Sequence, residues 1–138
     1  MGDREVIRLA SGMRRLLWFD AVAGLAVGLA LFALAVPLAP LFGYSLPFAR
    51  GLAAANFGYG CFALAIASRF PASAGAIPWL IAANAAWPLV SLALVAWVRD
   101  SATALGFAYL AGEAVFVGVL AGVEARALAR LRAAAPAA

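Results

Sequence analysis

The chain alternates long apolar stretches with short connections that contain proline, glycine or arginine. Four apolar stretches are separated in this way, and they cover residues 16–41, 48–67, 77–98 and 102–123. A helix that crosses a bilayer needs about 20 consecutive, mostly apolar residues. The pattern therefore predicts an all-α membrane protein, with four transmembrane helices that run alternately up and down in a four-helix bundle.

The stretch before the first span, residues 1–15, places arginines among apolar residues at helical spacing. It is typical of a short amphipathic segment on the cytoplasmic surface of the membrane. We expect the first span to end where Pro37, Pro40 and Gly43 interrupt the helix. This N-terminus also resembles a cleavable signal peptide, but its apolar run is long and Asp20 interrupts the start of that run. We therefore expect a retained anchor.

Residues 1–132 form a single predicted domain, because four spans and their connections use almost the whole chain. The end of the chain, residues 133–138, contains only alanine and proline and is expected to be disordered.

Pro88 lies inside the third span, lacks an N–H and pushes against the carbonyl group of Asn84, so we expect a kink there. The freed carbonyl suits a water or a small cation, unless a neighbouring helix repairs the kink. Spans three and four must be antiparallel neighbours, because their connection is very short.

Composition supports the membrane class, since 67% of the residues are hydrophobic and 12% are charged. A soluble domain of this length needs a much more polar surface. All ten basic residues are arginines that gather at the ends of apolar stretches, which indicates membrane anchoring and argues against a nucleic-acid partner. Histidine is absent and Cys61 is the only cysteine, so an internal disulfide and histidine-based metal or haem sites are excluded. We expect no cofactor and no metal site.

The arginines also predict the orientation of the chain, because positive charge is retained on the cytoplasmic side of a membrane. If the spans alternate, one side of the bilayer receives Arg50 and Arg99. The other side receives the remaining eight: Arg4, Arg8, Arg14, Arg15, Arg69, Arg126, Arg130 and Arg132. We therefore predict a multi-pass protein of a bacterial cytoplasmic (inner) membrane, with both termini in the cytoplasm.

Each predicted span contains one polar side chain that is costly in lipid: Asp20, Asn56, Asn84 and Glu113. Glu113 lies near the middle of the fourth span, where a charged carboxylate costs about 2.5–3.5 kcal/mol. We expect it to be buried and either protonated or hydrogen-bonded. Two interpretations of the set stay open. The side chains form separate interhelical hydrogen bonds, each worth about 0.6 kcal/mol on average, or together they form a polar path across the membrane.

Specific partners are expected for some of these groups. Asp20 is placed near the cytoplasmic boundary, where an ion pair with Arg69 or Arg126 is the simplest arrangement. Tyr59 and Tyr109 are candidate hydrogen-bond partners for Glu113 or Asn56.

Two glycine pairs at four-residue spacing predict close helix packing. Gly24 and Gly28 lie in the first span, and Gly118 and Gly122 lie in the fourth. On a helical wheel, Glu113 lies opposite the small residues of the fourth span. If those small residues pack inside the bundle, the carboxyl group must meet a different helix, another subunit or a water-filled cavity.

Three short segments carry a resemblance to other proteins. They are Leu-Leu-Trp-Phe-Asp-Ala at 16–21, Asn-Ala-Ala-Trp at 84–87, and Thr-Ala-Leu-Gly at 103–106, which leads to Glu124. In these segments the chain resembles a group of small, uncharacterised four-helix bacterial integral membrane proteins. The resemblance spans most of the chain and implies the four-helix fold and a retained first span. It implies no function.

For function, the sequence favours a non-enzymatic membrane protein that acts through helix–helix contacts. Its partners would be the lipid bilayer and either further copies of itself or a larger membrane complex. The alternative is a small proton- or cation-coupled transporter or channel, in which Glu113 exchanges a proton or cation and Asn56, Asn84 and Asp20 line the path. An enzyme would need Asp20 and Glu113 to act as a carboxylate pair, and their different depths argue against it.

Overall fold

The computed structural model describes residues 3–134, and within this range the chain is built from helices alone. The elements are α1 (Asp3–Ala33), α2 (Ala35–Phe42), α3 (Leu46–Arg69), the short 3-10 helix η1 (Ala74–Ala76), α4 (Ile77–Trp97) and α5 (Ala104–Ala134). Four of these helices, α1, α3, α4 and α5, are long and apolar enough to cross a membrane. The all-α class and the four membrane-length helices are thus confirmed, and they indicate a multi-pass membrane protein.

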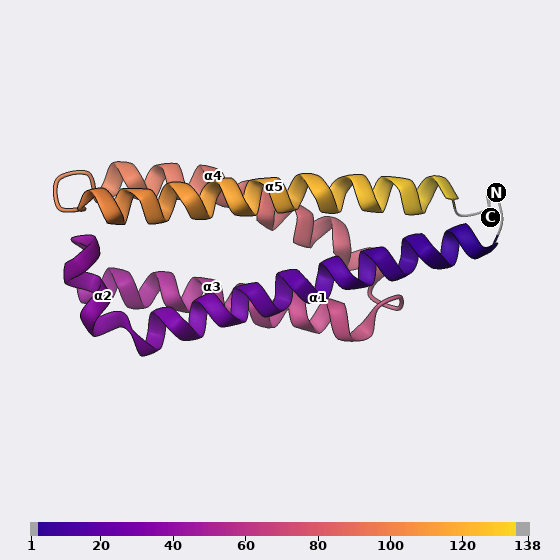
Figure 1. Cartoon of the computed structure of the whole chain (residues 1–138), viewed down its shortest axis with the longest axis horizontal. Helices are drawn as coiled ribbons and strands as arrows, with labels where there is room; N and C mark the ends of the chain where they lie inside the picture. Colours follow the sequence, from indigo (N-terminus) through magenta and orange to yellow (C-terminus); the bar gives the residue numbers. More distant parts are fainter. Residues whose placement is uncertain (1–2, 135–138) are drawn as a thin grey trace.

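The long helices are arranged as two pairs (Figure 1). Helix α1 packs along α3, and α4 packs along α5. A smaller contact between α1 and α5 joins the pairs. The start of α1 and the end of α5 lie at the same end of the molecule, and α2 lies at the opposite end, where it contacts both α3 and α5.

The predicted first span differs from the structure in its boundaries. Helix α1 runs unbroken from Asp3 to Ala33, so the described part of the predicted amphipathic stretch and the first part of the span are one helix. The chain then turns at Leu34 and forms α2, so the prediction of one span through residue 41 was wrong. The cause is Pro37, whose ring clashes with the carbonyl group of the residue four positions earlier, Ala33.

The other helix ends follow from local capping residues. Gly43 ends α2 with a left-handed φ of 70°, a conformation that glycine adopts without steric cost. Ser45 then caps α3 by accepting a hydrogen bond from the Phe48 backbone N–H at 3.3 Å. Helix α5 continues through Ala134. The start of the predicted tail is therefore helical, and residues 135–138 lie outside the described range.

Two glycines of α1 allow it to approach α3 closely. A Cβ atom on Gly24 would lie 3.1 Å from the Gly60 Cα atom, and one on Gly28 would lie 2.5 Å from the Phe57 backbone nitrogen. On the α3 side, a Cβ atom on Gly60 would lie 2.5 Å from the Leu25 backbone nitrogen. The backbones are thus in direct contact, as small residues permit.

The second predicted glycine pair does not form one packing ridge. A Cβ atom on Gly118 would meet the Pro88 ring at 3.2 Å, so Gly118 lies in the α4–α5 contact. A Cβ atom on Gly122 would have nothing within 4 Å. Spacing alone cannot distinguish the two, because α5 can diverge from its neighbour within the four residues that separate them.

Two apolar clusters form the core, one toward each end of the helices. The first includes Met13, Leu17, Ala63, Ile77, Leu80 and Leu128. The second includes Leu31, Tyr44, Leu52, Val98 and Leu110. In α1, α3 and α4, the residues between these clusters in sequence line a cavity, which is described below.

The end near α2 is fastened to the start of α5 by hydrogen bonds. The Thr103 hydroxyl donates to the Leu41 carbonyl at 2.8 Å, and the Tyr44 hydroxyl donates to the Gly106 carbonyl at 2.6 Å. The Phe42 ring stacks on the Tyr109 ring, with 5.3 Å between centroids. These contacts join α2 and the residues that follow it to the start of α5, at the end of the molecule where the second apolar cluster lies.

We predict that Gly60→Ala lowers the free energy of unfolding by about 1–3 kcal/mol, because the added methyl group overpacks a backbone contact that cannot give way. Thermal unfolding in detergent measures the change. The matched control is Gly58→Ala, two residues away on α3 and facing open space. It should stabilise the helix by about 0.5–1 kcal/mol, and equal effects of the two substitutions would contradict the close packing.

Candidate functional site

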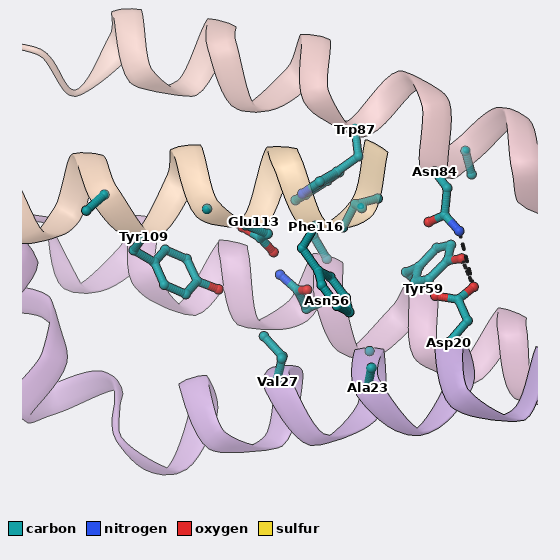
Figure 2. A pocket seen from close by; sticks show the side chains of 16 residues that line it. Asp20, Ala23, Val27, Asn56, Tyr59, Asn84, Trp87, Tyr109, Glu113 and Phe116 are labelled. Carbon is teal, nitrogen blue, oxygen red and sulfur yellow. Dashed lines mark hydrogen bonds between the residues drawn. The ribbon is translucent and has the colours of Figure 1, made fainter. Parts of the chain in front are cut away.

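The site is a cavity of about 500 Å³ between the two helix pairs (Figure 2). Helices α1, α3, α4 and α5 all contribute to its wall. The lining residues are Asp20, Ala23, Gly24, Val27, Ala55, Asn56, Tyr59, Ala83, Asn84, Trp87, Ala108, Tyr109, Gly112, Glu113, Phe116 and Val117. The wall is therefore mostly apolar, with a few polar groups at separate positions.

At one end of the cavity, four polar side chains from four helices form a hydrogen-bond cluster, in which only Glu124 Oε1 is buried without a partner among the described residues. Tyr59 of α3 donates its hydroxyl hydrogen to Asp20 Oδ2 of α1. Asn84 of α4 donates from Nδ2 to the same Asp20 oxygen at 3.2 Å and to Glu124 Oε2 of α5 at 3.1 Å. Asp20, Asn84 and Glu124 are buried, with 3%, 2% and 0% exposure. We call these four residues the acid–amide cluster.

The acid–amide cluster connects the two helix pairs. Asp20 and Tyr59 belong to the α1–α3 pair, whereas Asn84 and Glu124 belong to the α4–α5 pair. One amide nitrogen serves both carboxyl groups with its two hydrogens. In a low-dielectric interior, such hydrogen bonds are strong and their loss is costly, because no water replaces them.

The expected ion pair of Asp20 with Arg69 or Arg126 was wrong. Within residues 3–134 the only salt bridge joins Arg99 to the neighbouring Asp100, at 3.5 Å on the surface. The side chain of Asp20 is instead buried between the helices, where it accepts hydrogen bonds from Tyr59 and Asn84.

Glu113 lies in the middle of the cavity and has no hydrogen-bond partner. Both of its carboxyl oxygens are buried and unpaired in the described chain. The Trp87 indole and the Asn56 amide point toward it from α4 and α3 (Figure 2). Asn56 instead donates to the Leu52 carbonyl of its own helix, at 3.1 Å. The carboxyl group is thus surrounded by polar atoms but not satisfied by them.

Two hydrogen-bond donors near Glu113 are also buried without a partner. They are the Trp87 indole Nε1 and the Tyr109 hydroxyl. Leaving a buried donor or acceptor unsatisfied costs about 1–3 kcal/mol. Unsatisfied polar groups of three residues are thus gathered in the wall of one cavity, which is uncommon for buried polar groups.

The four predicted polar residues are thus divided into two groups. The structure brings Asp20 and Asn84 into direct contact, while Asn56 and Glu113 face the same cavity further along. Tyr59 does not bind Glu113 or Asn56 as expected, because its hydroxyl group donates to Asp20. The two carboxyl groups, Asp20 and Glu113, both line the cavity, and no hydrogen bond joins them in the described chain.

Two site residues were not identified as such from the sequence. Glu124 completes the acid–amide cluster, and Trp87 flanks Glu113. The spacing of the two glutamates carried a signal, since residues eleven apart lie about three turns along one helix face. For Trp87 the only signal was its position three residues after Asn84, on nearly the same face of α4.

The geometry of the polar groups does not resemble a metal centre. Within the described residues, no three His, Cys, Asp or Glu side chains are grouped so that they could hold a metal ion.

Comparisons of the chain with protein-family models, with curated proteins and with solved structures found no match. The case for a function therefore depends on the cavity itself.

We predict that Asn84→Ala destabilises the protein by about 1–3 kcal/mol or more, because it leaves two buried carboxyl groups without their shared donor. Thermal unfolding in detergent measures the loss. Ser91→Ala is the matched control on α4, since the Ser91 hydroxyl is buried and already unpaired. That substitution should be nearly neutral, and an equally small effect of Asn84→Ala would contradict the fastening role of the cluster.

Proposed function

We propose that this protein is a small proton- or cation-coupled membrane transporter in which Glu113 exchanges a proton for a cation. The observation that supports this proposal is the unpartnered state of Glu113, whose two carboxyl oxygens are buried in a cavity between helix pairs. Ionisable residues at such positions in membrane proteins commonly mark substrate paths or proton relays. A closed hydrogen bond to Asn56 or a tyrosine would have favoured a structural role instead.

The exchange follows from the cost of burying an uncompensated charge. A buried carboxylate without a counter-ion takes up a proton, because the neutral form needs far less solvation. A cation that enters the cavity supplies the missing charge and releases the proton. The titratable groups in the wall are Asp20 of α1, Tyr59 of α3, and Tyr109 and Glu113 of α5, and α4 contributes none. Of these, Glu113 is the carboxyl group with neither oxygen engaged.

The closures at the two ends of the cavity suit alternating access. The acid–amide cluster lies at one end, and the hydrogen bond of Thr103, just before α5, to the Leu41 carbonyl of α2 lies toward the other. In the proposed cycle these two sets of contacts act as the closures. Opening one closure at a time requires the α1–α3 and α4–α5 pairs to rock against each other, a common mechanism in small transporters. A kink of α4 at Pro88, beside Asn84, would provide a hinge for this movement.

The proposed setting is a bacterial inner membrane, with both termini in the cytoplasm. The eight-to-two distribution of arginines supports this orientation. In it, the acid–amide cluster lies on the cytoplasmic side of Glu113, because the start of α1 and the end of α5 lie beyond that cluster (Figures 1 and 2). The α2 end then faces the periplasm.

We predict that proteoliposomes carrying the wild-type protein exchange internal protons for an externally added cation, and that Glu113→Gln abolishes this exchange. An entrapped pH-sensitive dye reports proton movement while sodium, potassium and benzyltrimethylammonium are added in turn. Asp100→Asn is the control, because it neutralises an exposed carboxylate outside the cavity. An unchanged rate in Glu113→Gln, or no cation-dependent proton movement in the wild type, would refute the proposal.

A second candidate function is a homo-oligomer or an accessory subunit that acts through helix contacts. It is favoured by α3, where Gly51 and Gly58 face open space and the exposed Cys61 lies on the same side. Small residues on a lipid-facing helix surface allow another helix to approach closely.

For this second candidate, oxidative cross-linking in native membranes should convert the wild-type chain into a disulfide-linked dimer through Cys61. The Gly58→Leu substitution should reduce that product, because the larger side chain keeps a second helix away. A monomer band that persists under oxidation would argue against contact between copies through α3.

A further inference from the structure

The size of the cavity separates organic ligands from inorganic ions. Sites for small organic molecules occupy about 300–1,000 Å³, and this cavity of about 500 Å³ lies within that range. A water molecule occupies only about 30 Å³ in the liquid. A bare metal ion at Glu113 would therefore need many accompanying waters, and a wall that is mostly apolar offers those waters few hydrogen bonds.

The charge of the wall restricts the ligand further. Among the lining residues, Asp20 and Glu113 can carry a negative charge, and no arginine supplies a positive one. An anion would meet no compensating charge, while a neutral molecule would leave the Glu113 carboxyl group uncompensated. One oxygen of Asp20 already accepts two hydrogen bonds in the acid–amide cluster. Neither oxygen of Glu113 accepts a hydrogen bond in the described chain, so we take Glu113 as the group on which a single positive charge would be centred.

Aromatic rings flank this carboxyl group. In Figure 2 the rings of Trp87, Phe116 and Tyr109 lie on different sides of Glu113. A cation within about 6 Å of an aromatic face is attracted by the ring, most strongly by tryptophan. The attraction does not require the cation to carry a hydrogen, so quaternary ammonium groups are bound in the same way.

We infer that the cavity binds a monovalent organic cation, either a quaternary ammonium or a protonated amine attached to an apolar body. The charged nitrogen lies at Glu113 between the aromatic rings, and the apolar body fills the space lined by α1 and α3. The free Trp87 and Tyr109 donors serve ligands that also carry an acceptor atom. This inference rests on the proposed function and specifies the cation that is exchanged.

The test compares ligands of one shape and different charge. Isothermal titration calorimetry of the purified full chain in detergent measures the binding of benzyltrimethylammonium, benzyl alcohol and benzoate. We expect benzyltrimethylammonium to bind at least about tenfold more tightly than benzyl alcohol, and benzoate not to bind. Glu113→Gln should weaken binding of the cation about tenfold or more, Trp87→Leu about threefold or more, and Asp100→Asn not at all.

Equal affinity for benzyl alcohol and benzyltrimethylammonium would overturn the inference, and so would unchanged binding of the cation in Glu113→Gln. The ligand comparison needs only the wild-type protein, so it stays decisive if a variant does not fold. Glu113-dependent proton exchange driven by sodium or potassium, without binding of benzyltrimethylammonium, would uphold the proposed function and refute the organic ligand. Binding of benzyltrimethylammonium without proton exchange would refute the proposed function and uphold the binding of an organic cation.

Discussion

The side-chain amide of Asn84 links the two helix pairs in the buried interior of the protein. It donates to a carboxyl group on each side, Asp20 of α1 and Glu124 of α5. Polar groups in a membrane interior must be satisfied by the protein itself, so these three side chains constrain how the helix pairs approach. The α1–α5 contact is small compared with the contacts inside each pair, which makes this polar fastening important for the arrangement of the pairs.

The cavity is a consequence of that arrangement. The pairs are fastened at one end by the acid–amide cluster and at the other by the bonds of Thr103 and Tyr44 to their opposite segments. Between the fastenings, no side chain fills the space or satisfies Glu113. A carboxyl group that is expensive to bury and has no partner among residues 3–134 is the feature that favours ligand exchange over a purely structural role.

Hydropathy was sufficient to predict the four membrane-length helices, because length and apolarity alone decide whether a segment can span a bilayer. The break after Ala33 was also accessible from the sequence, through the effect of Pro37 on the residue four positions before it. The partners of Asp20 were not accessible, since they depend on where α1 begins and on which helix faces it. For the same reason, spacing could not show that Gly28 contacts a backbone while Gly122 faces open space.

The central claim is that a reagent entering the cavity can reach Glu113, a wall carboxyl group with no hydrogen-bond partner among the described residues. Dicyclohexylcarbodiimide, which is apolar and reacts with protonated carboxyl groups, tests it directly in membranes, with modified peptides identified by mass spectrometry. The account predicts that Glu113 is modified well before Asp20 and Glu124, each of which has one oxygen hydrogen-bonded in the acid–amide cluster. Modification of Asp20 or Glu124 with Glu113 left intact would contradict the account.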